Sequence, residues 1–354
     1  MTISKAFSSA PLRGLALCLT LGFLLLVSAP PAAAATTFKI ATVSPEGSMW
    51  MNSLRAAGKE IEAATDGRVK LKFYPGGVQG DDKVVMQKIR RNRLQGAVMT
   101  VGGLAAVNTN IQTYSFPLLF ESYDEIDYVR AQMDEKLLDE LASDGFRAFG
   151  FSEVGFGYAM TKTLATSVDD MRERKVWIPD DDPASAQAVD AFGITPVPLS
   201  IADVLAGLQT GLINAVAAPP IGALALQWHT QIDHVLDLPL LYVYGVFTIS
   251  DRSFSKLSVD DQAIVAEVLA AVVDKVNAQT RLDNARAREV LAQQGVAWTD
   301  AKANELPQWQ NLAETASARL IEEGVVSRAL YEELMGHLGD YRAQQSAATG
   351  SAGQ

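Results

Sequence analysis

Residues 38–101 alternate between two kinds of hydrophobic pattern, and this alternation constrains the fold more than any other feature of the sequence. Residues 38–43 and 69–73 have the pattern of short strands, and the residues between them carry apolar side chains at helical spacing. A strand, a helix and a strand in so few residues require a parallel strand pair with a right-handed crossover. A helix near 81–93 and an apolar strand at 97–101 extend the pattern. The chain is therefore predicted to be an α/β protein.

The second half of the chain repeats this organisation. Strands are expected at 149–160, 176–178, 195–199 and 213–216. Asp182-Pro183 is typical of a helix start, with the carboxylate as N-cap and proline as the first helical residue. Residues 238–249, rich in Val, Tyr and Phe, are predicted to form a strand that crosses back to the first unit.

Residues 258–294 carry one long helical pattern, which begins at a capping box and ends before Gly295. At 1.5 Å per residue, its ~36 residues reach about 54 Å, which exceeds one small domain. We therefore expect this helix to lie across two units. The tail 341–354, rich in Ala, Ser, Gly and Gln, is predicted to be disordered.

Residues 1–35 have the pattern of an export signal. Lys5 and Arg13 precede an apolar stretch, and small residues follow to a cleavage site after Ala34 or Ala35. The roughly 14 apolar residues fall short of the ~20 of a spanning helix, which argues against a membrane anchor. No later stretch has 18 apolar residues in a row, so no membrane insertion of the mature chain is expected. Cys18, the only cysteine, lies in this segment, which excludes a disulfide framework. The prediction is a periplasmic protein.

The sequence offers no recognisable catalytic apparatus. Its three histidines include His229 and His234, whose spacing does not place two metal ligands on one helix face. The acidic run 180–182 could hold a hard cation but is typical of a solvated helix cap. A net charge of −11 argues against nucleic acid as a partner. We therefore expect a binding protein without metal or cofactor, not an enzyme, with an exported Asp/Glu glycosidase as the alternative.

Four short segments occur in a recognisable order: YPGGVQGD at 74–81, SFPLLF at 115–120, LQTGLIN at 208–214 and the proline at 219. Together they resemble the solute-binding proteins of tripartite ATP-independent periplasmic (TRAP) transporters, the family that includes the C4-dicarboxylate binders. The resemblance runs from about residue 38 to 339. It implies a two-lobed periplasmic solute-binding protein of α/β class, with a long helix spanning both lobes and a small solute held between them.

The resemblance also implies the domain boundaries and the partners. Lobe I and lobe II would consist, respectively, of residues 36–154 plus 243–282 and 155–242 plus 283–340. The partners implied are a small-molecule ligand and the membrane permease subunits of a TRAP transporter.

Three positions depart from the pattern of that family. Its arginine in a K-I-R-V-P strand, which would grip a substrate carboxylate, corresponds to Trp177 here. A second arginine corresponds to Gly157, and an asparagine before the proline corresponds to Ala218. Burying a carboxylate without a partner costs several kcal/mol. The sequence therefore predicts a ligand other than a simple dicarboxylate or a sialic-acid-like anion.

These departures favour a small amine or amino alcohol, or a neutral or aromatic solute packed on Trp177, because a tryptophan face stabilises a desolvated cation by about 2 kcal/mol. Glu46 and Glu153 are the predicted counter-charges. The other predicted contacts are Val43, Trp50, Asp81, Thr100, Phe156 and Ile201. Core or capping roles stay open for several of these residues. A ligand sensor for a membrane kinase and a binder of an unusual organic acid stay open as functions.

Overall fold

The structure, a computed structural model, describes residues 2, 35–180 and 182–352, with side chains described as far as residue 348. The export signal predicted at 1–35 therefore lies outside the described residues, apart from Thr2 and Ala35. The described residues from Thr36 onward form one compact unit by their contacts. None of the helices in the described part of the chain is long and apolar enough to cross a membrane.

The first half of the unit is built on three parallel strands, as predicted. Strand β1 pairs with β2 on one side and with β3 on the other. Helices α2 and α3 form the crossovers between them, and the N-cap side chains Ser48 and Asp81 accept hydrogen bonds from their first turns. The bounds are β1 (Thr36–Thr42), α2 (Met49–Ala64), β2 (Val69–Tyr74), α3 (Asp82–Arg90) and β3 (Gly96–Thr100).

A second parallel set follows in the order β7-β5-β6. Asp182 caps helix α7, with Pro183 as its first residue, which confirms the predicted helix start. The bounds are β5 (Val176–Pro179), α7 (Pro183–Ala191), β6 (Pro196–Leu199), α8 (Val204–Thr210), β7 (Ala215–Ala218) and α9 (Pro220–Ala225). Strands β8 (His234–Asp237) and β10 (Ala297–Asp300), which pair with each other, extend this half.

Two long antiparallel strands join the halves. Strand β9 (Leu241–Ser250), the predicted returning strand, lies between β3 and β4. Strand β4 (Phe146–Thr161) pairs with β9 and continues into the second half, where it meets β7 and β8. Its pairing with β9 shifts register between Glu153 and Gly155, where Gly155 has φ 117°. The pairing is thus irregular in the middle of β4, and the lobe boundaries stay a prediction.

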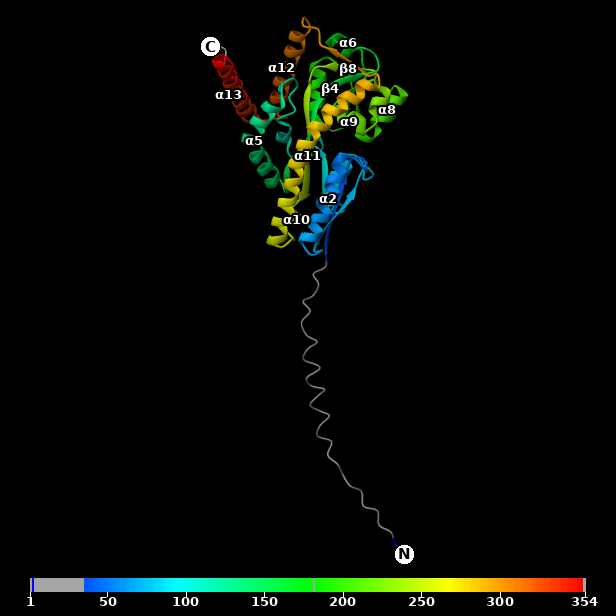
Figure 1. Cartoon of the computed structure of the whole chain (residues 1–354), viewed down its shortest axis with the longest axis vertical. Helices are drawn as coiled ribbons and strands as arrows, with labels where there is room; N and C mark the ends of the chain where they lie inside the picture. The colour runs from blue at the N-terminus through cyan, green and yellow to red at the C-terminus, as the bar shows by residue number, and fades with distance from the viewer. Residues whose placement is uncertain (1, 3–34, 181, 353–354) are drawn as a thin grey trace. The chain divides into compact units, whose positions relative to one another are not determined.

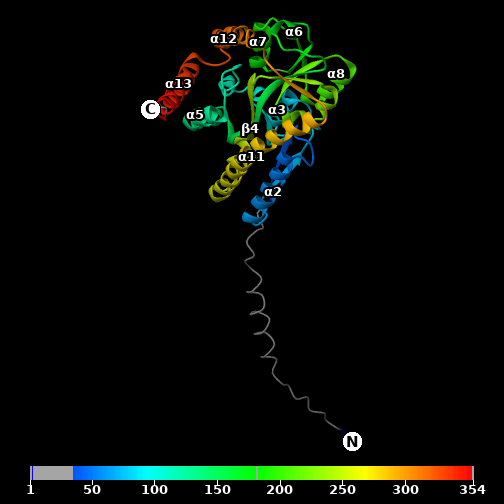
Figure 2. The same cartoon turned by 45° about the horizontal axis from the view of Figure 1, so that its top comes forward.

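Helix α11 (Val259–Gln293) confirms the predicted long helix. It has 35 residues, begins at the N-cap Ser258 and is followed by Gly295 with φ 93°. It packs on α2 in the first half, on β4 at the centre and on α9 in the second half. Figures 1 and 2 show it running past the joining strands from one half to the other. The fold is the expected two-lobed α/β architecture with a helix that spans both lobes.

Three further helices cover the unit, and the third corrects a prediction. They are α5 (Tyr123–Ser143), α12 (Leu306–Glu322) and α13 (Arg328–Ala352). The tail 341–354, predicted to be disordered, is helical to Ala352, and its first residues contact α5. Arg342 Nε donates to Glu125 Oε1 at 2.6 Å, and the rings of Tyr341 and Tyr128 lie 5.3 Å apart. Composition alone missed this packing, and alanine and glutamine are also good helix formers.

Candidate functional site

A cavity of about 270 Å³ lies where the carboxyl ends of β1, β3, β5 and β7 come together. Its wall includes Val43 after β1, Thr100 at the end of β3, Pro179 at the end of β5 and Ala218 at the end of β7. Residues of β9, of α11 and of several other helices and loops complete the wall. Ligands of parallel sheets gather at this edge, which makes the cavity the candidate functional site.

The cavity wall is apolar and rich in aromatic rings. The rings belong to Trp50, Trp177, Trp228, Tyr242, Tyr244 and Phe247. Hydroxyl groups come from four serines and Thr100. Among the described residues that line it, Asp182 is the only one with a carboxylate, and none is a lysine, arginine or histidine.

The polar atoms of three of these rings are already engaged with the protein. Trp177 Nε1 donates to Leu199 O at 2.9 Å, and the Trp177 ring packs on Trp228 with centroids 5.1 Å apart. The Tyr244 hydroxyl donates to Ile111 O, and the Tyr242 hydroxyl donates to Glu153 Oε2 at 3.0 Å. Burial raises the pKa of both tyrosines, so both stay neutral. These residues therefore offer the cavity ring surface rather than hydrogen bonds.

Asp182 is half-buried and lies at the seam between the two halves. Its Oδ1 accepts hydrogen bonds from Gln112 Nε2 at 2.5 Å and from Ser185 N at 3.2 Å, and its Oδ2 accepts from Ser185 Oγ at 2.8 Å. Gln112 belongs to the first half and Ser185 to α7 of the second half. The backbone of Gly102 lies against the carboxylate, since a Cβ there would be 2.7 Å from Asp182 Cγ. Residues from both halves of the molecule thus hold this carboxylate in position.

A second carboxylate, that of Asp82, lies beside the cavity in an adjoining outer pocket of about 620 Å³. That pocket shares Asp182 with the cavity and also carries Lys83 and Arg90. Thr100 Oγ1 donates to Asp82 Oδ2 at 3.5 Å. Burial raises the pKa of Asp82 to about 6, and the carboxylates of Asp81 and Asp182 add to that rise.

Asp82→Asn is expected to stabilise the protein at neutral pH. Because the folded-state pKa of about 6 exceeds the ordinary value of 3.8, the free energy of unfolding falls as the pH rises through this interval. Asparagine has no carboxyl group to ionise, so the variant avoids this loss of stability, which amounts to between about 1 and 3 kcal/mol above pH 7. Urea unfolding at pH 4 and at pH 7.5 checks this. A variant-to-wild-type difference that does not grow with pH would contradict it.

The structure brings six of the predicted site residues to the cavity and leaves five outside it. Those that line it are Val43, Trp50, Thr100, Trp177, Ile201 and Ala218. Two of the others have structural roles in the backbone, since Asp81 caps α3 and Gly157 pairs with Leu241. Phe156 is buried against Tyr123 and Tyr242.

The two predicted counter-charges each have an arginine of their own. Glu46 is exposed and forms an ion pair with Arg55 at 2.5 Å. Glu153 is fully buried, where it accepts hydrogen bonds from Arg281 at 2.9 to 3.2 Å and from the Tyr242 hydroxyl. The carboxylate at the cavity is instead that of Asp182, which sequence reasoning assigned to a solvated cap. Its place directly after the strand Val176–Pro179 is the signal that could have identified it.

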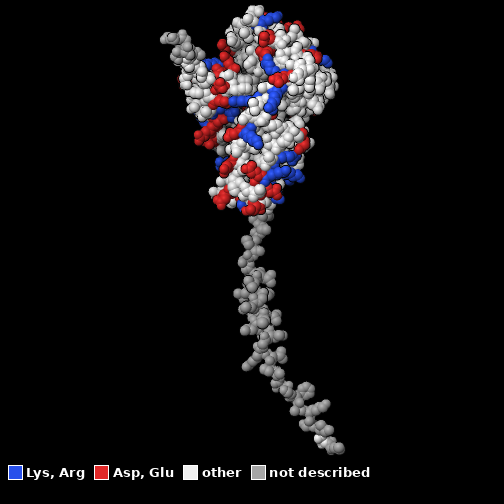
Figure 3. Space-filling view, viewed as in Figure 1, with Lys and Arg blue, Asp and Glu red and all other residues white. Residues whose placement is uncertain are grey.

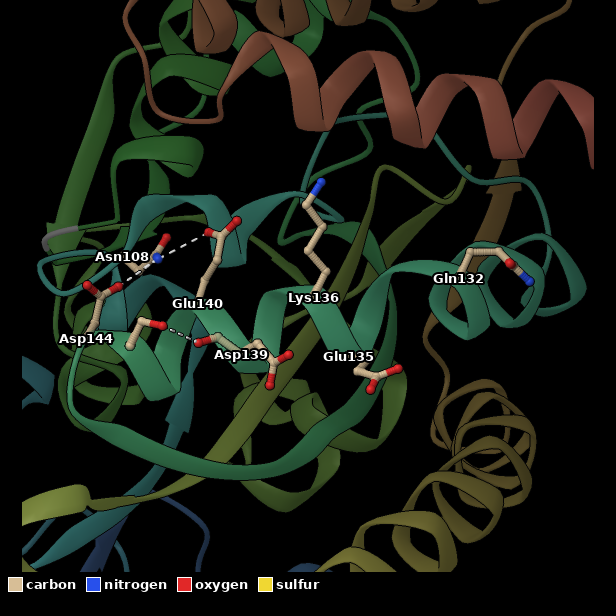
Figure 4. Close-up of a pocket in the computed structure, with 8 residues that line it drawn as sticks. Asn108, Gln132, Glu135, Lys136, Asp139, Glu140 and Asp144 are labelled. Atoms are coloured by element: carbon tan, nitrogen blue, oxygen red, sulfur yellow. Dashed lines mark hydrogen bonds between the residues drawn. The ribbon is translucent and has the colours of Figure 1, made fainter.

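A third pocket, of about 660 Å³, lies along α5 and is lined by polar side chains. Figure 4 shows the polar side chains of this helix that line it, together with Asn108. Asn108 donates to Asp144 at 2.8 Å, and Lys136 pairs with Glu333 of α13 at 2.5 Å.

Acidic and basic side chains are interspersed on the face shown in Figure 3. Within the described part of the chain, no three His, Cys, Asp or Glu side chains are grouped to hold a metal ion.

Comparison with known proteins adds three findings to this geometry. The model of the family described as bacterial extracellular solute-binding protein, family 7, matches residues 40–323. The sialic acid-binding periplasmic protein SiaP of Vibrio cholerae is 20% identical over 261 residues, covering 72% of this chain and 80% of that protein. The C4-dicarboxylate-binding periplasmic protein DctP of Rhodobacter capsulatus is 20% identical over 254 residues, covering 71% and 76%.

A solved structure has the same fold. It is a TRAP periplasmic solute-binding protein from Xanthobacter autotrophicus Py2 with bound β-D-galacturonate. The two structures superpose with a TM-score of 0.78 at 17% sequence identity, covering 85% of this chain and 99% of the other. At that identity the likeness establishes the fold.

Proposed function

The chain belongs to family 7 of the bacterial extracellular solute-binding proteins, the receptors of TRAP transporters, and on this basis we propose what it captures and where. The ligand is a small organic amine, an amino alcohol or a neutral molecule rather than a dicarboxylate. The protein binds it in the periplasm, within the cavity between its two lobes, and delivers it to a TRAP membrane permease.

One observation carries this proposal: among the described residues, no lysine, arginine or histidine lines the cavity, and the one charged side chain there is that of Asp182. An anionic solute would lose its hydration without gaining a positive partner, which costs several kcal/mol. A neutral solute loses little by the same transfer and gains contact with apolar surface, at about 25 cal/mol for each Å² removed from water.

The named solutes of the three relatives are a sialic acid, C4-dicarboxylates and galacturonate, all of them acids. Two features of this chain support a different ligand. The position that corresponds to the family arginine holds Trp177, whose ring forms part of the cavity wall. Arg281, an arginine close to the joining strands, is engaged by Glu153 and Asp127. Its hydrogen bonds with Asp127, and then those with Glu153, hold its pKa above the usual value.

A thermal-shift panel of amines, neutral solutes and dicarboxylates tests the proposal. A solute that binds only the folded protein stabilises it by about 2.7 kcal/mol at 100 times its dissociation constant. For a protein of this size, that corresponds to a rise in melting temperature of about 5 °C. We expect rises of this size only from amines or neutral solutes. A comparable rise with succinate would refute the ligand assignment, whereas no rise with any organic solute would count against the receptor function itself.

A further inference from the structure

The proposed function does not say which chemical group of the solute the protein recognises. The residues that line the cavity favour one kind of group. Resting on that function, we infer that the solute carries an alkylated ammonium group, which is held among aromatic rings with Asp182 as its counter-charge. The inference makes Asp182 the residue that determines specificity.

The first step concerns the hydrogen bonds that the cavity can offer. A primary ammonium group has three N–H donors, and each needs an acceptor once it leaves water. The Asp182 carboxylate already accepts three hydrogen bonds from Gln112 and Ser185. The hydroxyls of Tyr242 and Tyr244 are bound to Glu153 and Ile111. The acceptors that remain are the hydroxyl groups of four serines and of Thr100, so a cation with few or no N–H groups demands the fewest hydrogen bonds from this wall.

The second step concerns the rings. Trp177 and Trp228 meet at an interplanar angle of 71°, so they form a corner in the wall, and Tyr242 and Tyr244 are stacked at 17° elsewhere in it. Rings at different angles can contact several alkyl groups of one cation at once. Aromatic faces attract a desolvated cation through their quadrupole by about 2 kcal/mol, and this attraction needs no hydrogen bond.

The third step concerns charge. Asp182 faces the cavity with no basic side chain among the described residues that line it. Asp82 and Asp182 both line the adjoining outer pocket, so a second carboxylate lies near Asp182. Lys83 and Arg90 line only the outer pocket. The inner wall at Asp182 therefore favours a positive group over a neutral one of the same shape.

Titration calorimetry with a matched pair of probes tests this inference. The probes are choline and 3,3-dimethylbutan-1-ol, which have the same shape and differ by one positive charge. We expect the wild-type protein to bind choline at least about tenfold more tightly than the neutral alcohol. Asp182→Asn keeps an N-cap side chain for α7, since asparagine caps as well as aspartate, but it removes the charge. This variant is expected to bind choline at least about fivefold more weakly than the wild type and the neutral alcohol about equally, because only the attraction of the rings for the cation then remains.

Asp81→Asn is the control variant, because Asp81 is also a capping aspartate but lies outside the cavity wall. It is expected to keep the preference for choline. A wild-type protein that does not prefer choline to the alcohol, or an Asp182→Asn variant that keeps the full preference, would overturn the inference. Both results leave the receptor function standing. Tight binding of succinate in place of both probes would instead contradict the proposed ligand class.

Discussion

Trp177→Ala is expected to abolish solute binding and to lower the free energy of unfolding by about 3 to 5 kcal/mol. The Trp177 side chain is 8% exposed, packs on Trp228 and forms part of the cavity wall. Its removal enlarges the cavity and takes away a ring surface against which the solute would lie. The fold should persist, because the hydrogen bond of the ring to Leu199 O is its one polar contact and joins two neighbouring strands. Denaturant unfolding and thermal shift with the best solute of the panel measure the two effects.

Trp309→Ala provides the matched control. Trp309 is 2% exposed and is buried beside Phe192 in the same half of the molecule, but it does not line the cavity. It should lose a similar amount of stability and keep its affinity for the solute. If Trp177→Ala bound the solute as well as Trp309→Ala does, Trp177 would be a core residue without a part in recognition.

Arg281→Met is expected to lower the free energy of unfolding by about 3 to 5 kcal/mol, because it leaves the carboxylate of Glu153 buried without its cation. Glu153 is completely buried on β4, at the point where the strand shifts register. Arg281 lies on α11 between Asn277, which accepts a hydrogen bond from Glu153 N at 2.7 Å, and Asn284, which donates to Val154 O at 2.8 Å. These three side chains fasten the long helix to the strand that joins the lobes.

Two further variants test whether the unpaired carboxylate of Glu153 causes this loss of stability. Arg281→Met combined with Glu153→Gln should regain part of the lost stability, since the uncompensated charge is then absent. Arg55→Met breaks the exposed ion pair with Glu46 and should leave the urea midpoint unchanged. A loss in Arg281→Met no larger than that in Arg55→Met would show that the Glu153 pair does not stabilise the fold.

Much of the fold could be predicted because its signals are local. The alternation of strand and helix in residues 38–101, the caps at Ser48 and Ser258, and the 35-residue helix α11 all depend on neighbours within a few turns. The route of β4 through both halves was harder to foresee, because one strand pairs with three others. The helical tail depends on contact with α5, some 217 residues away in the chain.

Part of the candidate site could likewise be predicted from local signals, whereas the rest depends on contacts between residues far apart in the chain. Trp177 and Ala218 could be identified from their positions in motifs of the family, and Thr100 from its place at the end of a parallel strand. Glu153 could not be separated from a ligand contact by sequence, because its partner Arg281 is 128 residues away. The carboxylate of Asp182 gave a local capping signal that is correct, and its second position, at the cavity wall, depends on the assembled sheet.

We propose that the solute binds in a cavity whose lining, among the described residues, carries no positive charge, and calorimetric titration of the purified protein with succinate tests this most directly. The non-acidic solute that gives the largest thermal shift serves as the positive control in the same buffer. We predict no measurable heat of binding for succinate and saturable binding for the control. Saturable binding of succinate with an affinity equal to or above that of the control would contradict the claim.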